Sequence, residues 1–212
     1  MLISEIFVSI QGESTYAGLP CVFVRLAGCN LRCSWCDTPY ARSAEGAKEV
    51  SATHILNEVK QFKCDLVEIT GGEPLLQEGA KDLAVRLLDA GHGVLIETNG
   101  SVSLAGLDER AVKIVDFKCP SSGHAGSFLI DNLNFITPAD EIKFVIGNRE
   151  DYDSAKKFLD EYLSGRTQKL LFAPVKPSLE PKVLAEWILR DRLKVRFQLQ
   201  LHTYIWSDER GR

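Results

Sequence analysis

Residues 23–38 read Phe-Val-Arg-Leu-Ala-Gly-Cys-Asn-Leu-Arg-Cys-Ser-Trp-Cys-Asp-Thr, an apolar run that passes directly into a loop with three cysteines. The apolar residues up to Leu26 predict a strand, and parallel α/β folds gather their ligands where strands end. The thiols of Cys29, Cys33 and Cys36 are therefore placed to converge on a metal. On spacing alone three interpretations stay open: a [4Fe-4S] cluster with one open iron, a structural zinc with a fourth ligand elsewhere, and unligated thiols.

The remaining chain alternates predicted strands and helices. Hydrophobic periodicity predicts strands over 2–10, 21–26, 66–70, 94–98, 111–117, 141–146, 169–173 and 194–201. It predicts helices after a Ser51 cap, around 83–88, over 152–163 and after Pro181. This order indicates an opening hairpin and then a parallel sheet with right-handed crossovers, closed or partly closed into a barrel. Segments 41–49 and 121–140 have no regular pattern. They are either loops over a site or ordinary surface connections.

Composition narrows the class of protein. The chain has 212 residues, 45% hydrophobic and 25% charged, with a net charge of −4. These values are typical of one globular domain, and the absence of a basic surplus argues against nucleic acid or anionic lipid as partners. The sequence has no apolar run of 18 residues and no secretory signal at its start, so we expect a cytoplasmic protein without a membrane span.

A second motif, Gly71-Gly72-Glu73-Pro74, directly follows a predicted strand. Glycines allow a ligand to approach the backbone, and the Glu73 carboxylate can accept hydrogen bonds from an ammonium group. Taken alone, the motif is more typical of an ordinary turn than of a ligand site.

Together the two motifs resemble the radical S-adenosylmethionine superfamily, in which they occur in this order. Within it, several segments resemble the 7-carboxy-7-deazaguanine synthase family, namely 9–14, 23–31, 36–38, 70–75, 97–100, 116–123 and 199–205. The resemblance implies one radical SAM domain over residues 1–212 with the fold of a partial, open (β/α) barrel of reduced helix content. The last residues, 207–212, are expected to form a disordered tail.

The resemblance also implies three cofactors. Cys29, Cys33 and Cys36 would bind the [4Fe-4S] cluster, and S-adenosylmethionine would occupy its open iron. Thr38 would coordinate Mg²⁺, although Asp37 is the more obvious metal ligand by charge. The implied contacts with S-adenosylmethionine are Trp35 near the adenine, Gly72 and Glu73 at the methionine ammonium, and Cys36, Asp37, Asp116, Phe117, Lys118, Ala173, Pro174, Val175 and Lys176.

The implied reaction is a ring contraction of 6-carboxy-5,6,7,8-tetrahydropterin to 7-carboxy-7-deazaguanine, with loss of ammonia, in queuosine and 7-deazapurine biosynthesis. Gln11 and Glu13 suit the amide-like edge of that pterin, and Arg25 suits its carboxylate, although Arg25 also fits a salt bridge at a strand end. The substrate contacts implied are Ile10, Gln11, Gly12, Glu13, Arg25, Thr70, Glu97 and His202. No side chain is assigned a catalytic role, because the cofactor carries the chemistry.

Two other function classes remain open. One is a small activating enzyme that installs a glycyl radical on a partner protein, and the other is a non-catalytic, metal-stabilised binding module. An electron donor such as flavodoxin or ferredoxin and a homodimer are the implied partners. About four substantial helices are too few for a full barrel, so we expect a lateral opening closed by a partner subunit or by substrate. Cys21, Cys64 and Cys119 match no cluster position and are expected to be buried apolar groups.

Overall fold

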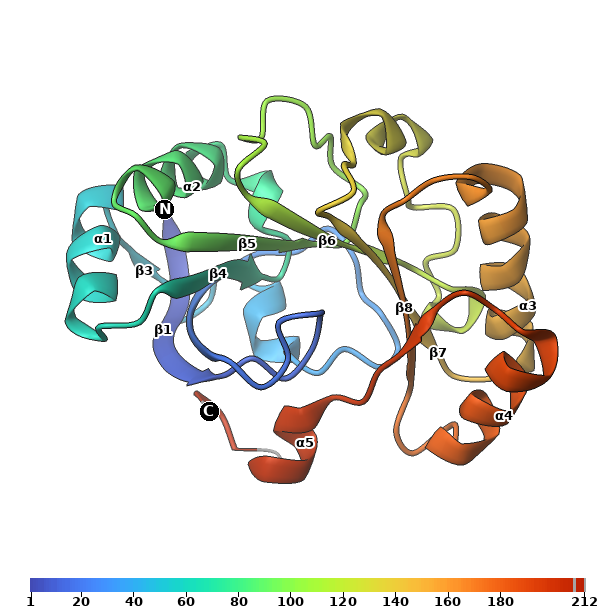
Figure 1. Cartoon of the computed structure of the whole chain (residues 1–212). Coiled ribbons are helices and arrows are strands. Elements are labelled where there is room, and N and C mark those ends of the chain that lie inside the picture. Colours follow the sequence, from blue (N-terminus) through green and yellow to red (C-terminus); the bar gives the residue numbers. More distant parts are fainter. Residues whose placement is uncertain (208, 212) are drawn as a thin grey trace.

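The computed structural model describes residues 1–207 and 209–211, and its frame is one nine-stranded sheet in the order β3-β1-β2-β4-β5-β6-β7-β8-β9 (Figure 1). The strands are β1 (Leu2–Ile10), β2 (Pro20–Leu26), β3 (Lys48–Glu49), β4 (Leu66–Gly71), β5 (Gly93–Thr98), β6 (Val112–Phe117), β7 (Glu141–Ile146), β8 (Lys169–Pro174) and β9 (Arg196–Phe197). β1 is antiparallel to β2 and β3, and all neighbouring pairs from β2 to β9 are parallel. The sheet ends at β3 and β9 without closing, which confirms the predicted open barrel.

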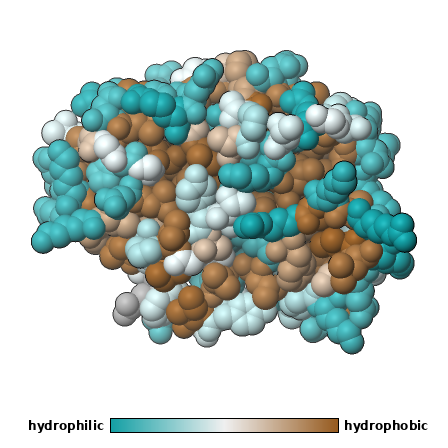
Figure 2. All heavy atoms as spheres, viewed as in Figure 1, coloured by the Kyte–Doolittle hydropathy of each residue, from teal (hydrophilic) through white to brown (hydrophobic). Residues whose placement is uncertain are grey.

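Four substantial helices cover the outer face of the sheet, as predicted. They are α1 (Ala52–Gln61), α2 (Gly79–Asp89), α3 (Arg149–Phe158) and α4 (Pro181–Asp191), and a shorter α5 spans Leu201–Ile205. α1 and α2 lie at one end of the sheet and α3 and α4 at the other (Figure 1). Hydrophilic residues gather over these two ends (Figure 2). Among the described residues, no helix is long and apolar enough to cross a membrane.

Local sequence explains where these helices begin and end. The Ser51 hydroxyl caps α1 by accepting a hydrogen bond of 3.2 Å from the His54 amide. Pro181 opens α4 in the first turn, where its missing N–H costs nothing. α3 begins at Arg149, earlier than the predicted start, because Asn148 caps it, and it continues as a π-helical turn over Leu159–Leu163. Short 3-10 turns occupy Pro39–Arg42, Pro74–Leu76, Pro120–Ser122 and Ile130–Phe135.

Alternation along the strands separates an apolar face from a polar one. On β4, Val67 and Ile69 are buried in the hydrophobic core beneath the helices, whereas Glu68 and Thr70 line the cavity on the concave side. Phe144 on β7 joins the core in the same way, while its neighbour Lys143 faces inward. The concave face of the sheet is thus polar, and the opposite face packs in the hydrophobic core.

The loop between β1 and β2 covers one end of the concave side. The amide of Thr15 donates a hydrogen bond of 3.1 Å to Glu141 at the start of β7, and Lys169 at the start of β8 lies 3.3 Å from the Thr15 hydroxyl. Because parallel strands start at the same edge, this loop closes the amino end of the open barrel. The site residues Gln11, Gly12 and Glu13 belong to this loop.

The predicted last strand over 194–201 is wrong in its extent. Only β9 is extended, and Leu201 already begins α5. The amide of Gln198 still bonds to Phe172 O at 2.9 Å, but the amide of Leu201 donates to Gly12 O at 3.0 Å. The chain therefore leaves the sheet and crosses to the loop between β1 and β2. Pro174 at the end of β8 has no N–H with which to continue the pairing.

The C-terminal segment crosses the side where we predicted a lateral opening. After α5, residues 207 and 209–211 line the cavity, and Arg210 lies 3.3 Å from Glu5 on β1. The described part of the expected disordered tail is thus placed against the site. Positions 208 and 212 of that tail lie outside the described residues. The chain's own C-terminal segment contributes to this wall (Figure 1).

Candidate active site

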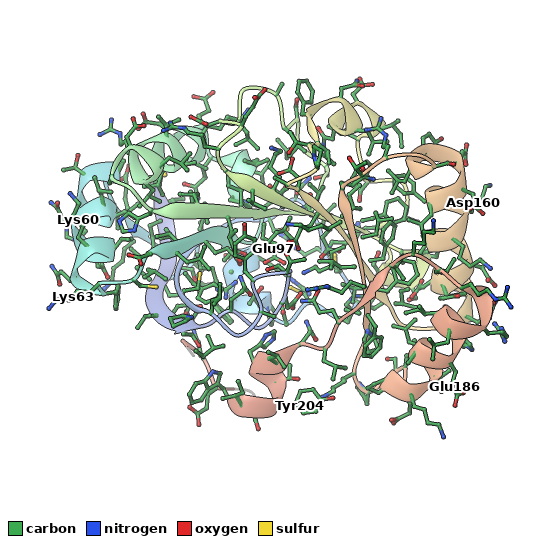
Figure 3. All side chains as sticks on the ribbon, viewed as in Figure 1. Lys60, Lys63, Glu97, Asp160, Glu186 and Tyr204 are labelled. Atoms are coloured by element: carbon green, nitrogen blue, oxygen red, sulfur yellow. The ribbon has the colours of Figure 1, made fainter. Side chains whose placement is uncertain are left out.

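A cavity of about 370 Å³ lies on the concave side of the sheet. Most of the residues predicted to bind cofactor, metal or substrate line it: Ile10, Gln11, Gly12, Glu13, Arg25, Cys29, Cys33, Trp35, Cys36, Asp37, Thr38, Thr70, Gly72, Glu97, Asp116, Lys118 and His202. Glu97 lies at the centre of the molecule, whereas the labelled Lys60, Asp160 and Glu186 lie at its edges (Figure 3). The motifs that are dispersed in the sequence therefore converge on one space.

The other predicted cofactor contacts lie outside the lining of the cavity: Glu73, Phe117, Ala173, Pro174, Val175 and Lys176. Phe117 packs in the core against Phe158 in a tilted arrangement, with ring centroids 4.3 Å apart. The Lys176 ammonium lies 3.2 Å from the ring centroid of Tyr204 on α5, so it anchors the C-terminal segment. That these six residues contact S-adenosylmethionine stays a prediction. In this structure the side chains of Phe117 and Lys176 make other contacts.

The three clustered cysteines share one wall and are half-buried free thiols. Backbone contacts hold their loop: the Cys29 amide donates to Arg42 O at 3.1 Å, and Arg42 Nη2 donates to Cys33 O at 2.7 Å. Burial raises the pKa of Cys33, and the nearby Lys118 ammonium opposes that rise. The loop is thus fixed by contacts that leave the thiols facing the cavity.

The three clustered thiols are not as close together as a single ion requires. Thiolates around one tetrahedral zinc lie roughly 3.8 Å apart, given a Zn–S distance of about 2.3 Å. Within residues 1–207 and 209–211, donor atoms of three such groups lie within 4.8 Å of one another only for Glu13, Asp37 and His202. Cys21, Cys64 and Cys119 do not line the cavity, so no fourth thiol completes a zinc site among the described residues.

The glycines of the second motif are required by close packing. A Cβ on Gly71, whose φ is +153°, would lie 2.2 Å from Leu26 O, and one on Gly72 would lie 2.3 Å from Gly28 O. These contacts bring the end of β4 against the cysteine loop. The turn interpretation and the ligand interpretation of this motif are therefore compatible, because Gly72 also lines the cavity.

Glu73 lies outside the lining of the cavity, and its predicted contact with an ammonium group stays a prediction. Its side chain is fully buried, and the carboxylate accepts hydrogen bonds from Leu75 N at 3.0 Å, Thr98 Oγ1 at 2.8 Å and Asn99 N at 2.7 Å. Burial raises the pKa of Glu73, and these three donors oppose the rise. The contacts fix Asn99, which lines the cavity with its amide 3.9 Å from Cys29 Sγ. In this structure Glu73 ties β5 to the cysteine loop.

An ionic cluster occupies the concave side of β4 to β7. Lys143 Nζ lies 2.7 Å from Glu13 and 2.5 Å from Glu97, and Thr70 Oγ1 donates to the second oxygen of Glu97 at 3.1 Å. Burial opposes the ionisation of Glu97, but Lys143 and Thr70 outweigh it and lower the pKa of Glu97 to about 2. Glu97 therefore serves as a hydrogen-bond acceptor at neutral pH.

Glu68 lies beside this cluster without a cation of its own among the described residues. Its carboxyl accepts a hydrogen bond from Gln11 Nε2. Burial, and next the charge of Glu97, raise the pKa of Glu68 well above its usual value. Its contribution to stability is therefore full below the unfolded pKa of about 4.3 and is lost as the pH rises through the folded pKa.

Glu68→Gln is expected to flatten the pH dependence of stability. The parent protein should lose stability as the pH rises toward 8, whereas the neutral glutamine keeps the acceptor for Gln11 and has no charge to bury. Above pH 7 we expect a gain of about 1 kcal/mol, or about 2–4 °C in Tm. Thermal unfolding from pH 5 to 9 measures this, with the exposed Glu186→Gln as control. Parallel pH profiles for parent and Glu68→Gln would contradict it.

A second ionic group surrounds Arg25 on β2. Arg25 Nε donates to Glu5 at 2.9 Å, and Glu5 also accepts a hydrogen bond of 2.6 Å from Tyr40. Burial raises the pKa of Tyr40 to about 12, and Arg25 opposes that rise. Arg210 lies over the Tyr40 ring at 3.9 Å from its centroid. The predicted salt bridge of Arg25 thus exists, and it uses only one of the three guanidinium nitrogens.

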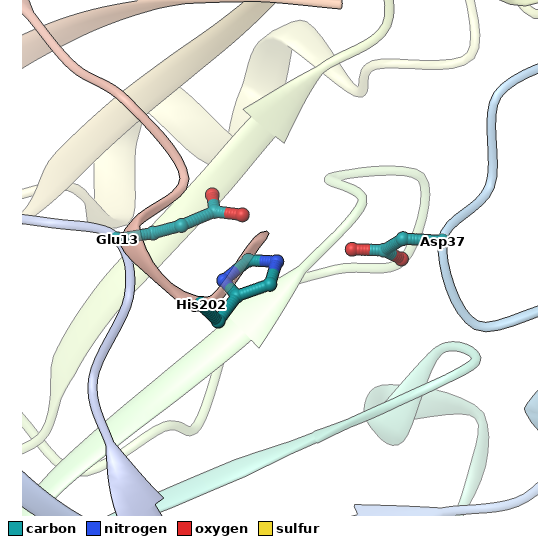
Figure 4. Close-up of side chains that lie close together, drawn as sticks. All are labelled: Glu13, Asp37 and His202. Carbon is teal, nitrogen blue, oxygen red and sulfur yellow. The ribbon is translucent and has the colours of Figure 1, made fainter. Parts of the chain in front are cut away.

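Glu13, Asp37 and His202 meet across the cavity (Figure 4). Gly12 permits this approach, because a Cβ there would lie 2.3 Å from His202 Nδ1. Thr38, next to Asp37, donates to its carboxylate at 3.3 Å. Two carboxylates, an imidazole and a hydroxyl thus form an oxygen-rich corner that suits a hard cation.

Sequence reasoning missed several lining residues. Glu68, Lys143, Asn99, Tyr40 and Arg42 all line the cavity, and each bonds to a predicted site residue or to a neighbour of one. The signal for Glu68 and Lys143 is a charged residue inside an otherwise apolar strand, because such a residue is buried only with a partner. His202 directly follows the predicted last strand over 194–201, whereas in the structure it lies on α5.

Comparisons with known proteins agree with this geometry. The sequence model of the Radical SAM superfamily matches residues 24–164. A 7-carboxy-7-deazaguanine synthase of Koribacter versatilis is 46% identical over 99% of this chain and 98% of its own length. The one from Chlorobaculum tepidum is 45% identical over 99% of this chain and 96% of its own. The crystal structure of QueE from Escherichia coli has the same fold, with a TM-score of 0.78 at 23% identity, over 95% of this chain and 94% of that one.

Proposed function

The chain belongs to the radical SAM superfamily and, within it, to the 7-carboxy-7-deazaguanine synthases, and we propose that it performs the reaction for which that family is named. It would convert 6-carboxy-5,6,7,8-tetrahydropterin into 7-carboxy-7-deazaguanine with loss of ammonia. The observation that carries the proposal is the meeting of three thiols and a buried polar recognition surface in one cavity. We assign the chain to a single domain over 1–212, supported by its one continuous sheet.

Cys29, Cys33 and Cys36 would hold a [4Fe-4S] cluster that leaves one iron for the amino and carboxylate groups of S-adenosylmethionine. When bound, these cofactors supply an electron and a carbon radical able to abstract a hydrogen atom. The protein's contribution is to position the cofactor and the substrate. Asp116 lines the same cavity with one buried carboxylate oxygen that has no hydrogen-bond partner among the described residues, and its other oxygen holds Lys118 at 2.7 Å. That unpartnered oxygen is suited to accept a donor from the cofactor.

The other walls suit the pterin. Glu13 and Glu97 accept hydrogen bonds, as the amino group and ring N–H of a guanine-like edge require, and Thr70 lies between β2 and β5 beside them. Arg25 offers its terminal nitrogens to the carboxylate, and His202 and Gln11 flank the same space. A pterin of this polarity fills such a cavity better than a protein loop does, which disfavours the activating enzyme.

The decisive experiment is anaerobic reconstitution with iron and sulfide, followed by reduction with S-adenosylmethionine with and without the carboxypterin. Chromatography with mass detection should show 7-carboxy-7-deazaguanine and ammonia. Zinc instead of iron in the site would overturn the assignment of the cluster. Formation of 5′-deoxyadenosine with an untouched pterin would favour the activating enzyme.

We further propose a Mg²⁺ ion coordinated by Thr38, supported by the oxygen-rich corner beside it. Thr38→Ala is expected to lower kcat by about 10- to 100-fold, comparable to the loss of a metal-shell partner, without changing iron content. Activity titrated with Mg²⁺ measures this. An equal Mg²⁺ response in parent and variant would remove Thr38 as a ligand and favour Asp37.

The partners and the location remain proposals. We propose a flavodoxin- or ferredoxin-type electron donor, since the reaction needs a low-potential electron. The cysteines are all free, which suits the reducing cytoplasm. A homodimer is proposed from the family resemblance, and the exposed apolar side chains Leu129, Ile130 and Phe135 offer a contact surface for it.

A further inference from the structure

Lys143 is the cation at the centre of the recognition surface, although no motif of the sequence marks it. Its side chain on β7 is only 5% exposed. Its ammonium contacts three carboxylates from three different elements: Glu13 at 2.7 Å, Glu97 at 2.5 Å and Asp116 at 3.8 Å. One buried charge therefore joins the loop after β1 to β5 and β6.

Hydrogen bonds and ion pairs restrict the positions of the Glu13 and Glu97 carboxylates. Gln200 Nε2 donates to the other oxygen of Glu13 at 2.7 Å, as Thr70 does for Glu97. Each carboxylate is thus held at both oxygens by donors from the protein. A carboxylate oxygen has more than one lone pair, so each can still accept a hydrogen bond from a ligand.

The contrast with Lys113 shows that this arrangement is more than a structural ion pair. Lys113 on β6 is equally buried and pairs with Asp140 at 3.0 Å, but neither residue lines the cavity. Lys143 lines it together with all three of its carboxylate partners. Structural pairing alone requires one carboxylate, whereas Lys143 gathers three that line the ligand space.

We propose that Lys143 is a positioning residue that determines specificity, by fixing Glu13 and Glu97 as a paired acceptor for the 2-amino and N–H edge of the pterin. This inference rests on the proposed function and names how that substrate is selected. Lys143 acts through the two glutamates and is not itself a catalytic residue. A substrate without the 2-amino group would leave a fixed, desolvated acceptor unpaired, which is the strong form of discrimination.

Removal of the cation should loosen this acceptor. In Lys143→Gln the three carboxylates face one another without the shared charge, so they take up protons or move apart. We expect kcat/KM for the carboxypterin to fall by about 30- to 1,000-fold, mostly through KM. The preference for the carboxypterin over its 2-deamino analogue should fall by at least about tenfold. Iron content should stay unchanged.

The experiment uses the reconstituted enzyme with both pterins and compares Lys143→Gln, Lys143→Arg and the matched control Lys113→Gln. Binding of each pterin to the oxidised holoenzyme with S-adenosylmethionine, measured by calorimetry, gives a readout apart from turnover. Lys143→Arg should keep most of the preference, since the charge remains between the glutamates. Lys113→Gln should lower Tm and leave the preference as in the parent.

If Lys143→Gln does not fold, Lys143→Gln/Glu68→Gln repeats the test against Glu68→Gln alone. The second substitution removes a neighbouring acid and so balances the lost cation, while Glu13 still lacks its partner. An unchanged KM and an unchanged preference in either Lys143→Gln variant would overturn the inference. A parent enzyme that leaves the carboxypterin unconverted would overturn the proposed function instead, which distinguishes the two failures.

Discussion

Cys33→Ser is expected to give a colourless protein after anaerobic reconstitution and to lower pterin conversion by at least about 1,000-fold. The alkoxide needed to replace a thiolate is not available near neutral pH, and two remaining thiols do not hold a cluster. Because Cys33 lies in the cavity wall beside Lys118, its loss leaves the ligand set incomplete without disturbing the sheet. Iron and sulfide analysis, the absorbance of the cluster and the yield of 5′-deoxyadenosine measure the effect.

Cys64→Ser is the matched control. Cys64 is also a free, half-buried thiol, but its sulfur donates to Pro20 O at 3.3 Å and does not line the cavity. A serine hydroxyl can make the same hydrogen bond, so iron content and activity should equal those of the parent. Full iron loading in Cys33→Ser, or an equal loss in Cys64→Ser, would contradict the assignment of the cluster.

The sequence predicts most of the sheet because its strands are apolar runs bounded by turn residues. β7 is expected over 141–146 and lies there, and the Ser51 cap of α1 is found as predicted. The end of the chain is predicted poorly. The alternation around Gln198 is typical of a strand, but the partner that captures Leu201 is Gly12, which lies far away in the sequence. Hydrophobic periodicity predicts local secondary structure, but it does not predict a hydrogen-bond acceptor that lies far away in the sequence.

The same distinction explains which site residues could be predicted. The cysteines and Glu13 are parts of local motifs, so their types and spacing carry the information. The role of Lys143 depends on the register that sets β7 beside β6 and on the loop that carries Glu13 beneath both. For Glu73 the resemblance names the residue, whereas two of its three hydrogen-bond donors, Thr98 Oγ1 and Asn99 N, come from the tertiary structure and hold the carboxylate outside the lining of the cavity.

Arg25→Gln is expected to be the most severe change on the substrate side. Within the described residues Arg25 donates a hydrogen bond to Glu5 through Nε, and the side chain lines the cavity, so we expect its terminal nitrogens to serve a carboxylate there. Two charge-assisted hydrogen bonds are worth about 3–4 kcal/mol, so kcat/KM for the carboxypterin should fall by about 100- to 1,000-fold. Glu5 keeps Tyr40 and Arg210 as partners, and the fold should therefore tolerate the substitution.

The measurement that isolates this role compares the carboxypterin with a tetrahydropterin that lacks the 6-carboxylate. The parent should bind the carboxylated compound at least about 100-fold more tightly than the other compound. Arg25→Gln should bind the two almost equally, because it lacks the guanidinium that contacts the carboxylate. Arg25→Lys should fall between them, because a lysine keeps the charge but contacts the carboxylate at one point. If Arg25→Gln retains the parent's preference, Arg25 serves only its salt bridge with Glu5, and the carboxylate must bind elsewhere in the cavity.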